Sequence, residues 1–134
     1  MREILFRGKD FSGVINHSWC FGSLDTTEDD RAIIIYLDRF GNKCRIFVNP
    51  ETVGQYAGLK DKNGTKIFEG DIVKRFWFGK MCIYQIDYDN GLASFIGRAG
   101  MKFTTFDYDS AEFEVVGNIH DNPELLRGND NAER

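Results

Sequence analysis

Residues 72–96 read IVKRFWFGKMCIYQIDYDNGLASFI. In this stretch, runs rich in Ile, Val, Phe and Tyr alternate with the short turn signals Gly79-Lys80 and Asp89-Asn90-Gly91. Such runs are typical of β-strands, and Asn-Gly supplies the positive φ angles of a tight hairpin turn. With two further runs at 101–106 and 112–119, the pattern predicts five short strands after residue 71. Their tight connections indicate a small β-barrel in the C-terminal half, since a curled sheet closes its own edges.

The N-terminal part of the chain is also expected to be β. Strand-like runs occupy 2–7, 19–24, 32–37 and 44–48. Asn49-Pro50 predicts a short helical turn, because Asn is a preferred N-cap and Pro suits the first helical position, and Asn122-Pro123 repeats this pattern. The fold class is therefore mostly β with short helical turns.

We expect three parts along the chain. Residues 1–57 form an N-terminal β segment that packs on the barrel, residues 58–127 form the barrel region with a C-terminal turn, and residues 128–134 form a frayed tail. Edge strands within 31–48 could pair with a second copy, so a homo-oligomer is possible.

Composition excludes several classes of protein. The chain has 134 residues with 42% hydrophobic and 14% aromatic residues, as in ordinary globular proteins and unlike disordered chains. Its longest apolar run, Ala32–Leu37, is far shorter than the roughly 20 residues of a membrane-spanning helix, and no membrane partner is expected. The N-terminus lacks a secretory signal pattern, and Cys20, Cys44 and Cys82 form no CxxC motif. We therefore expect a cytoplasmic protein without zinc or another cofactor.

The net charge of −4 is unevenly distributed. Residues 58–106 hold 8 basic and 5 acidic groups, whereas residues 107–134 hold 2 basic and 8 acidic groups. One interpretation is a solvated surface followed by an acidic tail. The other is a basic face for phosphate groups that the acidic end masks.

Three blocks of sequence carry a family resemblance: MREILFRGK (1–9), PETVGQYAGLKDKNGTKIFEGDIVK (50–74) and VVGNIHDNPELL (115–126). Together with Trp19 and Gly22, these blocks make the chain resemble the YopX family of phage and prophage proteins. The resemblance spans nearly the whole chain and implies a phage or prophage origin, the cytoplasm of a bacterial host and an SH3-like barrel. It implies no activity and supplies no catalytic residues, because the family is uncharacterised.

The strongest binding signal is the segment KRFWFGK (74–80), with three basic and three aromatic side chains in seven positions. Strand alternation places Arg75 and Trp77 on one face, and Lys74, Phe76, Phe78 and Lys80 on the other. We expect one of these aromatic sets to lie in the core. An exposed set would suit a protein interface, where Trp and Arg are favoured anchors, or single-stranded nucleic acid, which stacks on aromatic rings.

Two Asp-Tyr-Asp triplets offer a different chemistry. Asp87 and Asp89 share a strand face, as do Asp107 and Asp109, so four carboxylates would meet if the triplets were neighbours. Such oxygen ligands could hold Mg²⁺ or Mn²⁺, although Asp is also a common turn residue and turns are the favoured interpretation. Arg98 falls in a predicted Gly97–Gly100 loop, which could bind an anion or be a plain hairpin loop.

These signals favour a non-enzymatic protein-binding module that acts on a host or phage protein. The first alternative is a nucleic-acid-binding accessory protein, with the candidate binding residues Lys74, Arg75, Trp77, Lys80, Arg98 and Lys102. The second alternative is an Mg²⁺- or Mn²⁺-dependent enzyme built on the Asp-Tyr-Asp triplets.

Overall fold

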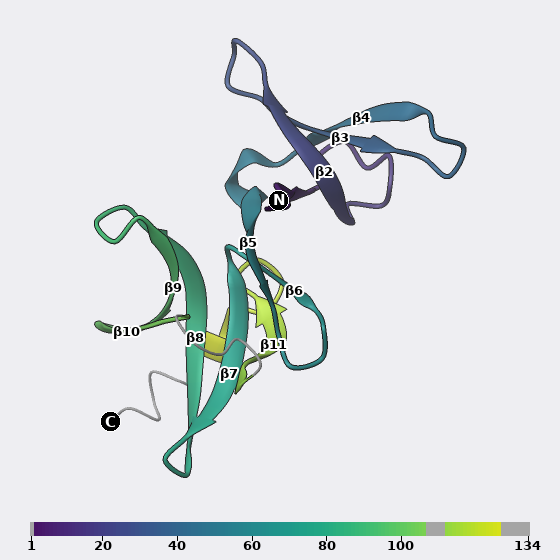
Figure 1. The fold of residues 1–134 in the computed structure, drawn as a ribbon. Coiled ribbons are helices and arrows are strands. Elements are labelled where there is room, and N and C mark those ends of the chain that lie inside the picture. Colours follow the sequence, from purple (N-terminus) through teal and green to yellow (C-terminus); the bar gives the residue numbers. More distant parts are fainter. Residues whose placement is uncertain (1, 107–111, 127–134) are drawn as a thin grey trace. The chain divides into compact units, whose positions relative to one another are not determined.

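The computed structural model describes residues 2–106 and 112–126 (Figure 1). The chain is mostly β, as the sequence predicts, and it divides into two compact units, Met1–Tyr56 and Ala57–Arg134. The predicted short helical turns are present as a 3-10 helix, η1 (Pro50–Thr52), and a helical turn at 124–126. The side chain of Asn49 caps η1 by accepting a hydrogen bond from the Glu51 N–H. No helix among the described residues is long and apolar enough to cross a membrane.

The first unit holds most of a six-stranded antiparallel sheet with the strand order β4-β3-β2-β1-β5-β6, of which the end of β5 and β6 (Lys66–Phe68) belong to the second unit. Its strands are β1 (Phe6–Lys9), β2 (Trp19–Thr26), β3 (Ala32–Leu37), β4 (Lys43–Val48) and the start of β5 (Gly54–Lys60). Strand β2 pairs first with β1 and then with β3, and Gly22 lies where it changes partner. A Cβ atom at Gly22 would lie 2.1 Å from the Ile35 carbonyl oxygen, so only glycine allows this close approach.

The core of the first unit lies on one face of this sheet, around Cys20, Ile34 and Ile46. In the sheet order β4 is the outer strand, but residues 9–11 cover its end: Phe11 donates to the Phe47 carbonyl and Asn49 donates to the Lys9 carbonyl. This cover shortens the edge on which the predicted pairing with a second copy depends.

A buried carboxylate organises the loop after β1. Asp10 accepts hydrogen bonds from the backbone N–H groups of Ser12, Ile15 and His17. Burial alone would raise the pKa of Asp10, but these hydrogen bonds outweigh it and lower the pKa below its ordinary value. The loop is therefore held by a charged acceptor at neutral pH.

The second unit contains the rest of β5, β6 (Lys66–Phe68) and a five-stranded antiparallel sheet. The order of that sheet is β10-β9-β8-β7-β11. Its strands are β7 (Asp71–Trp77), β8 (Lys80–Asp89), β9 (Ser94–Ala99), β10 (Lys102–Thr105) and β11 (Glu114–Asn118). Among the described residues the sheet is open, with β10 and β11 at its edges, so the SH3-like barrel stays a prediction.

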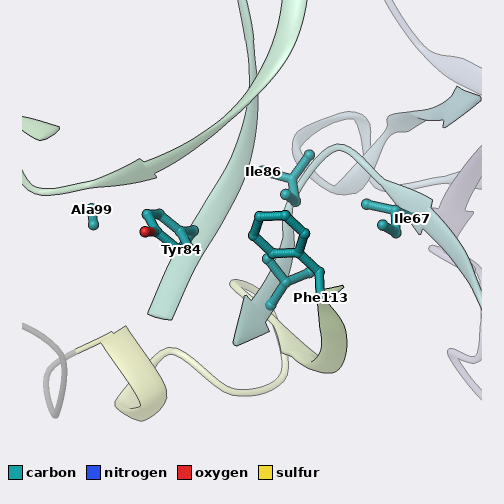
Figure 2. Packing of buried hydrophobic residues seen from close by; sticks show 6 residues of the cluster. Ile67, Tyr84, Ile86, Ala99 and Phe113 are labelled. Atoms are coloured by element: carbon teal, nitrogen blue, oxygen red, sulfur yellow. The ribbon is translucent and has the colours of Figure 1, made fainter. Parts of the chain in front are cut away.

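One hydrophobic core holds the second unit together (Figure 2). Ile67 of β6 packs with Tyr84 and Ile86 of β8 and with Phe113, which is almost completely buried. Asp61, in the turn between β5 and β6, accepts hydrogen bonds from the N–H groups of Asn63, Thr65 and Val115. The β5–β6 turn is thereby tied to β11.

Candidate functional site

The end of the β7–β8 hairpin extends beyond the neighbouring strands of its sheet (Figure 1). The pairing of β11 with β7 ends at Lys74, and the pairing of β9 with β8 ends at Gln85. Residues 75–82 continue as a two-stranded ribbon, in which Arg75 faces Cys82 and Trp77 faces Lys80. We call residues 75–82 the ribbon. It extends past Lys74 by three strand residues, roughly 10 Å.

Three consecutive aromatic residues at the end of the ribbon form what we call the aromatic tip. The exposed fractions of Phe76, Trp77 and Phe78 are 69%, 45% and 92%. The Trp77 and Phe78 rings meet edge to face with their centroids 4.9 Å apart, whereas Phe76 pairs with Met81. The prediction that one aromatic set is buried is wrong, because the ribbon runs past the strands and core of its sheet.

The turn at the tip has an unusual residue in it. Phe78 and Gly79 have φ angles of 51° and 76°, so both central positions of the turn are left-handed. A two-residue hairpin turn of this kind prefers Asn-Gly, and a bulky aromatic residue seldom adopts a positive φ. The sequence pattern predicts this turn one residue later, at Gly79-Lys80, and therefore predicts that Phe78 belongs to the strand.

The side chain of Arg75 is nearly buried within the second unit, and it contacts the aromatic tip through the ring of Trp77. Only 11% of its side chain is exposed, and its guanidinium carbon lies 4.3 Å from the Trp77 ring centroid and 4.8 Å from that of Phe113. Its Nη2 donates to the hydroxyl oxygens of Tyr84 and Thr104, both at 3.3 Å. The charge is thus held among aromatic rings, which favour a cation over their faces.

The neutral hydroxyl group of Tyr84 accepts the hydrogen bond from Arg75. Burial raises the pKa of Tyr84, and the hydrogen bond from Arg75 opposes part of that rise. The phenol therefore keeps its proton at neutral pH. Glu112 lies 3.9 Å from the Arg75 Nη1 and balances the buried positive charge.

The other predicted basic residues do not gather at one place. Lys74 lies 3.5 Å from the Glu114 carboxylate, and Arg98 lies 3.0 Å from Asp87. Lys80 flanks the turn at the tip, whereas Lys102 begins β10, two strands away from β8 in the sheet order. Of the six candidate binding residues, only Lys74, Arg75, Trp77 and Lys80 belong to the β7–β8 hairpin.

The first Asp-Tyr-Asp triplet binds an arginine in the structure. Arg98 contacts Asp87 through Nε and Asp89 through Nη2 at 3.5 Å. Asp107 and Asp109 lie outside the described residues. Within residues 2–106 and 112–126, no group of three or more His, Cys, Asp or Glu side chains could hold a metal ion.

The prediction of a loop at Gly97–Gly100 is wrong for three of these four residues. Gly97, Arg98 and Ala99 belong to β9, and Gly97 pairs with Ile86. A Cβ atom at Gly97 would lie 3.1 Å from the Cβ of Tyr84, so this glycine makes room for the tyrosine of the core. Gly97 is therefore explained by packing between neighbouring strands, whereas Gly100, with a φ of 61°, lies in the turn between β9 and β10.

Comparison with known proteins adds family and fold. A family model described as YopX protein matches residues 6–127. Among solved structures, the chain is similar to the crystal structure of protein EF1440 from Enterococcus faecalis, with 24% sequence identity and a TM-score of 0.55. The match covers 94% of this chain and 99% of that chain, and at this identity it shows the fold alone. None of the curated proteins matches this chain.

Proposed function

We propose that this chain, which belongs to the YopX protein family, is a small, non-enzymatic binding protein whose ribbon engages a protein partner. We place this partner among host or phage proteins of the bacterial cytoplasm, following the phage and prophage character of the family. The proposal rests on the site, because family membership alone carries no activity.

The observation that carries the proposal is the exposure of the aromatic tip. Phe76, Trp77 and Phe78 present apolar rings to water on a projecting ribbon, where burial against a partner is favourable. Aromatic residues, Phe among them, are also enriched in protein interfaces, and Trp is one of the commonest anchors. Arg75 holds Trp77 in place before binding, so less conformational freedom is lost on association.

The pairing of the basic residues supports a protein partner over nucleic acid. Arg98 lies against a carboxylate, Arg75 is enclosed by aromatic rings, and Lys74 shares the Glu114 carboxylate with Lys62. A protein that binds the phosphate backbone of nucleic acid uses several Lys and Arg side chains that are not already paired with carboxylates. Stacking of bases on Trp77 next to Lys80 keeps nucleic acid as the second candidate.

We further propose that the second unit is an SH3-like small barrel in its packing. The β5–β6 hairpin and the five-stranded sheet share one core, with Ile67 on one side and Val73, Tyr84 and Ile86 on the other. In such a unit the projecting ribbon is a loop-like binding element on a rigid base.

Site-specific photocrosslinking tests the proposed function. We replace Phe78 in the full-length chain with the photoreactive amino acid benzoylphenylalanine and irradiate bacterial cells that produce it. The matched control carries the same group at Phe40, another exposed phenylalanine, in the turn between β3 and β4.

The expected result is a discrete protein adduct from position 78 that is weak or missing from position 40, and that disappears when Trp77 is also changed to Ala. The same adducts from both positions, or none from position 78, would contradict a partner at the tip. An adduct removed by nuclease would favour the nucleic-acid candidate instead.

A further inference from the structure

In the part of the chain that the structure describes, the charges along the ribbon and at its base do not balance. The Nζ atoms of Lys62 and Lys74 both lie 3.5 Å from the same oxygen of Glu114, so one carboxylate serves two lysines. The described residues offer no ion pair to Lys80, which faces Trp77 across the ladder. Arg75 is matched by Glu112. Among residues 2–106 and 112–126, two positive charges are therefore left over, one at the base of the ribbon, shared by Lys62 and Lys74, and one on Lys80 at the aromatic tip.

This local charge has the opposite sign to the whole chain, whose formal net charge is −4. A local field of this kind steers a partner of opposite sign toward one surface and sets the orientation of the encounter. The nearby apolar surface is aromatic, and Phe78 is its most exposed member.

From this combination we propose that the partner segment recognised by the ribbon is acidic, with carboxylates flanking an apolar pocket or an apolar side chain that receives the aromatic tip. The proposal rests on the proposed function, because it names the chemistry of the same site. The carboxylates meet Lys80 and the surplus charge shared by Lys62 and Lys74.

The charge near the tip favours carboxylates over a phosphate backbone. Nucleic acid carries one negative charge at every nucleotide, and its affinity for a protein rises with the number of phosphates that Lys and Arg side chains contact. Two separate surplus charges, one at the aromatic tip and one at the base of the ribbon, instead match a short protein segment with a few acidic residues.

The lysine charge and the aromatic rings are expected to affect different rate constants of partner binding. A charge at the rim of an interface changes mainly the association rate, whereas a buried anchor changes mainly the dissociation rate. Lys80→Glu should therefore slow association, and Phe78→Asn should speed dissociation. Lys43→Glu is the matched charge control, because Lys43 is an exposed lysine on β4 in the other unit and is not among the candidate binding residues.

The experiment uses a random library of 12-residue peptides as the probe. The library is selected by display on the immobilised full-length chain alone, and each recovered peptide is then measured on the unchanged chain and on the Phe78→Asn chain. We expect the recovered peptides to be rich in Asp and Glu beside aromatic or aliphatic residues. For a synthetic copy of one such peptide, Lys80→Glu should weaken binding about tenfold, mainly through association, and Lys43→Glu should change it less than about twofold.

The outcomes separate this inference from the proposed function. Peptides that bind the Phe78→Asn chain as tightly as the unchanged chain would overturn the aromatic tip as the binding site, and both proposals with it. Peptides that need Phe78 but are neutral or basic, or that respond equally to Lys80→Glu and Lys43→Glu, would overturn only the acidic partner. A labelled single-stranded oligonucleotide that displaces the peptide and binds more tightly would overturn it in favour of nucleic acid.

Discussion

Phe78 occupies the first of two left-handed positions in the β7–β8 turn. An L-residue with a Cβ is disfavoured there, by about 1–2 kcal/mol, whereas Asn tolerates the conformation and commonly precedes Gly in such turns. Phe78→Asn should therefore raise the free energy of unfolding by about 1 kcal/mol while it removes the most exposed ring of the tip. Urea denaturation of the full-length chain measures the change.

The matched control is Phe76→Asn. Phe76 is also an exposed ring, but it lies in β7, where Asn is a poor strand residue. This variant should gain no stability. A lower urea midpoint for Phe78→Asn than for the unchanged chain would show that the ring stabilises the turn, and that its position reflects folding and not binding.

At the scale of elements, the ribbon depends on Arg75. Arg75→Met keeps a long apolar stem but removes the charge over Trp77 and the donors to Tyr84 and Thr104. We expect unfolding to become easier by about 1–3 kcal/mol. Trp77 should also emit at longer wavelength and become more accessible to acrylamide, measured with Trp19→Phe in the background so that one tryptophan reports.

Arg75→Lys tests the geometry of the contact apart from its charge. Lysine keeps the positive charge but cannot stack a planar group on the ring or fork between two hydroxyls. It should give an intermediate effect on the emission of Trp77. Unchanged emission in Arg75→Met would mean that Trp77 is positioned without the arginine.

The elements show which features the sequence could predict. Strand β3 was predicted with its observed bounds, Ala32–Leu37, and the cap of η1 at Asn49 was predicted too. These features depend on a few neighbouring residues. The exposure of Phe76 could not be predicted, because it depends on where β9 and β11 stop along the hairpin. The prediction of a loop at Gly97 was wrong for a related reason. The need for glycine there depends on Tyr84, which lies on another strand and not among the neighbouring residues of the sequence.

At the scale of the whole molecule, the two units have separate cores. The core around Ile34 draws its residues from 6–53, and the core around Ile86 draws its residues from 57–115. The sequence interpretation divided the chain between residues 57 and 58, and the structure divides it between Tyr56 and Ala57. The boundary falls within β5, whose first residues pair with β1. Each core can therefore be weakened by a substitution that leaves the other intact.

Separate cores predict separate unfolding. Ile34→Ala and Ile86→Ala each remove a fully buried side chain, which typically destabilises a core by about 2–5 kcal/mol. Trp19 reports on the first unit and Trp77 on the second, so single-tryptophan chains can follow each unit in urea. Ile34→Ala should lower the midpoint reported by Trp19 more than that reported by Trp77, and Ile86→Ala should do the reverse. If either substitution moved both midpoints equally, the two cores would unfold as one cooperative structure, because a shared transition is the mark of a single cooperative unit.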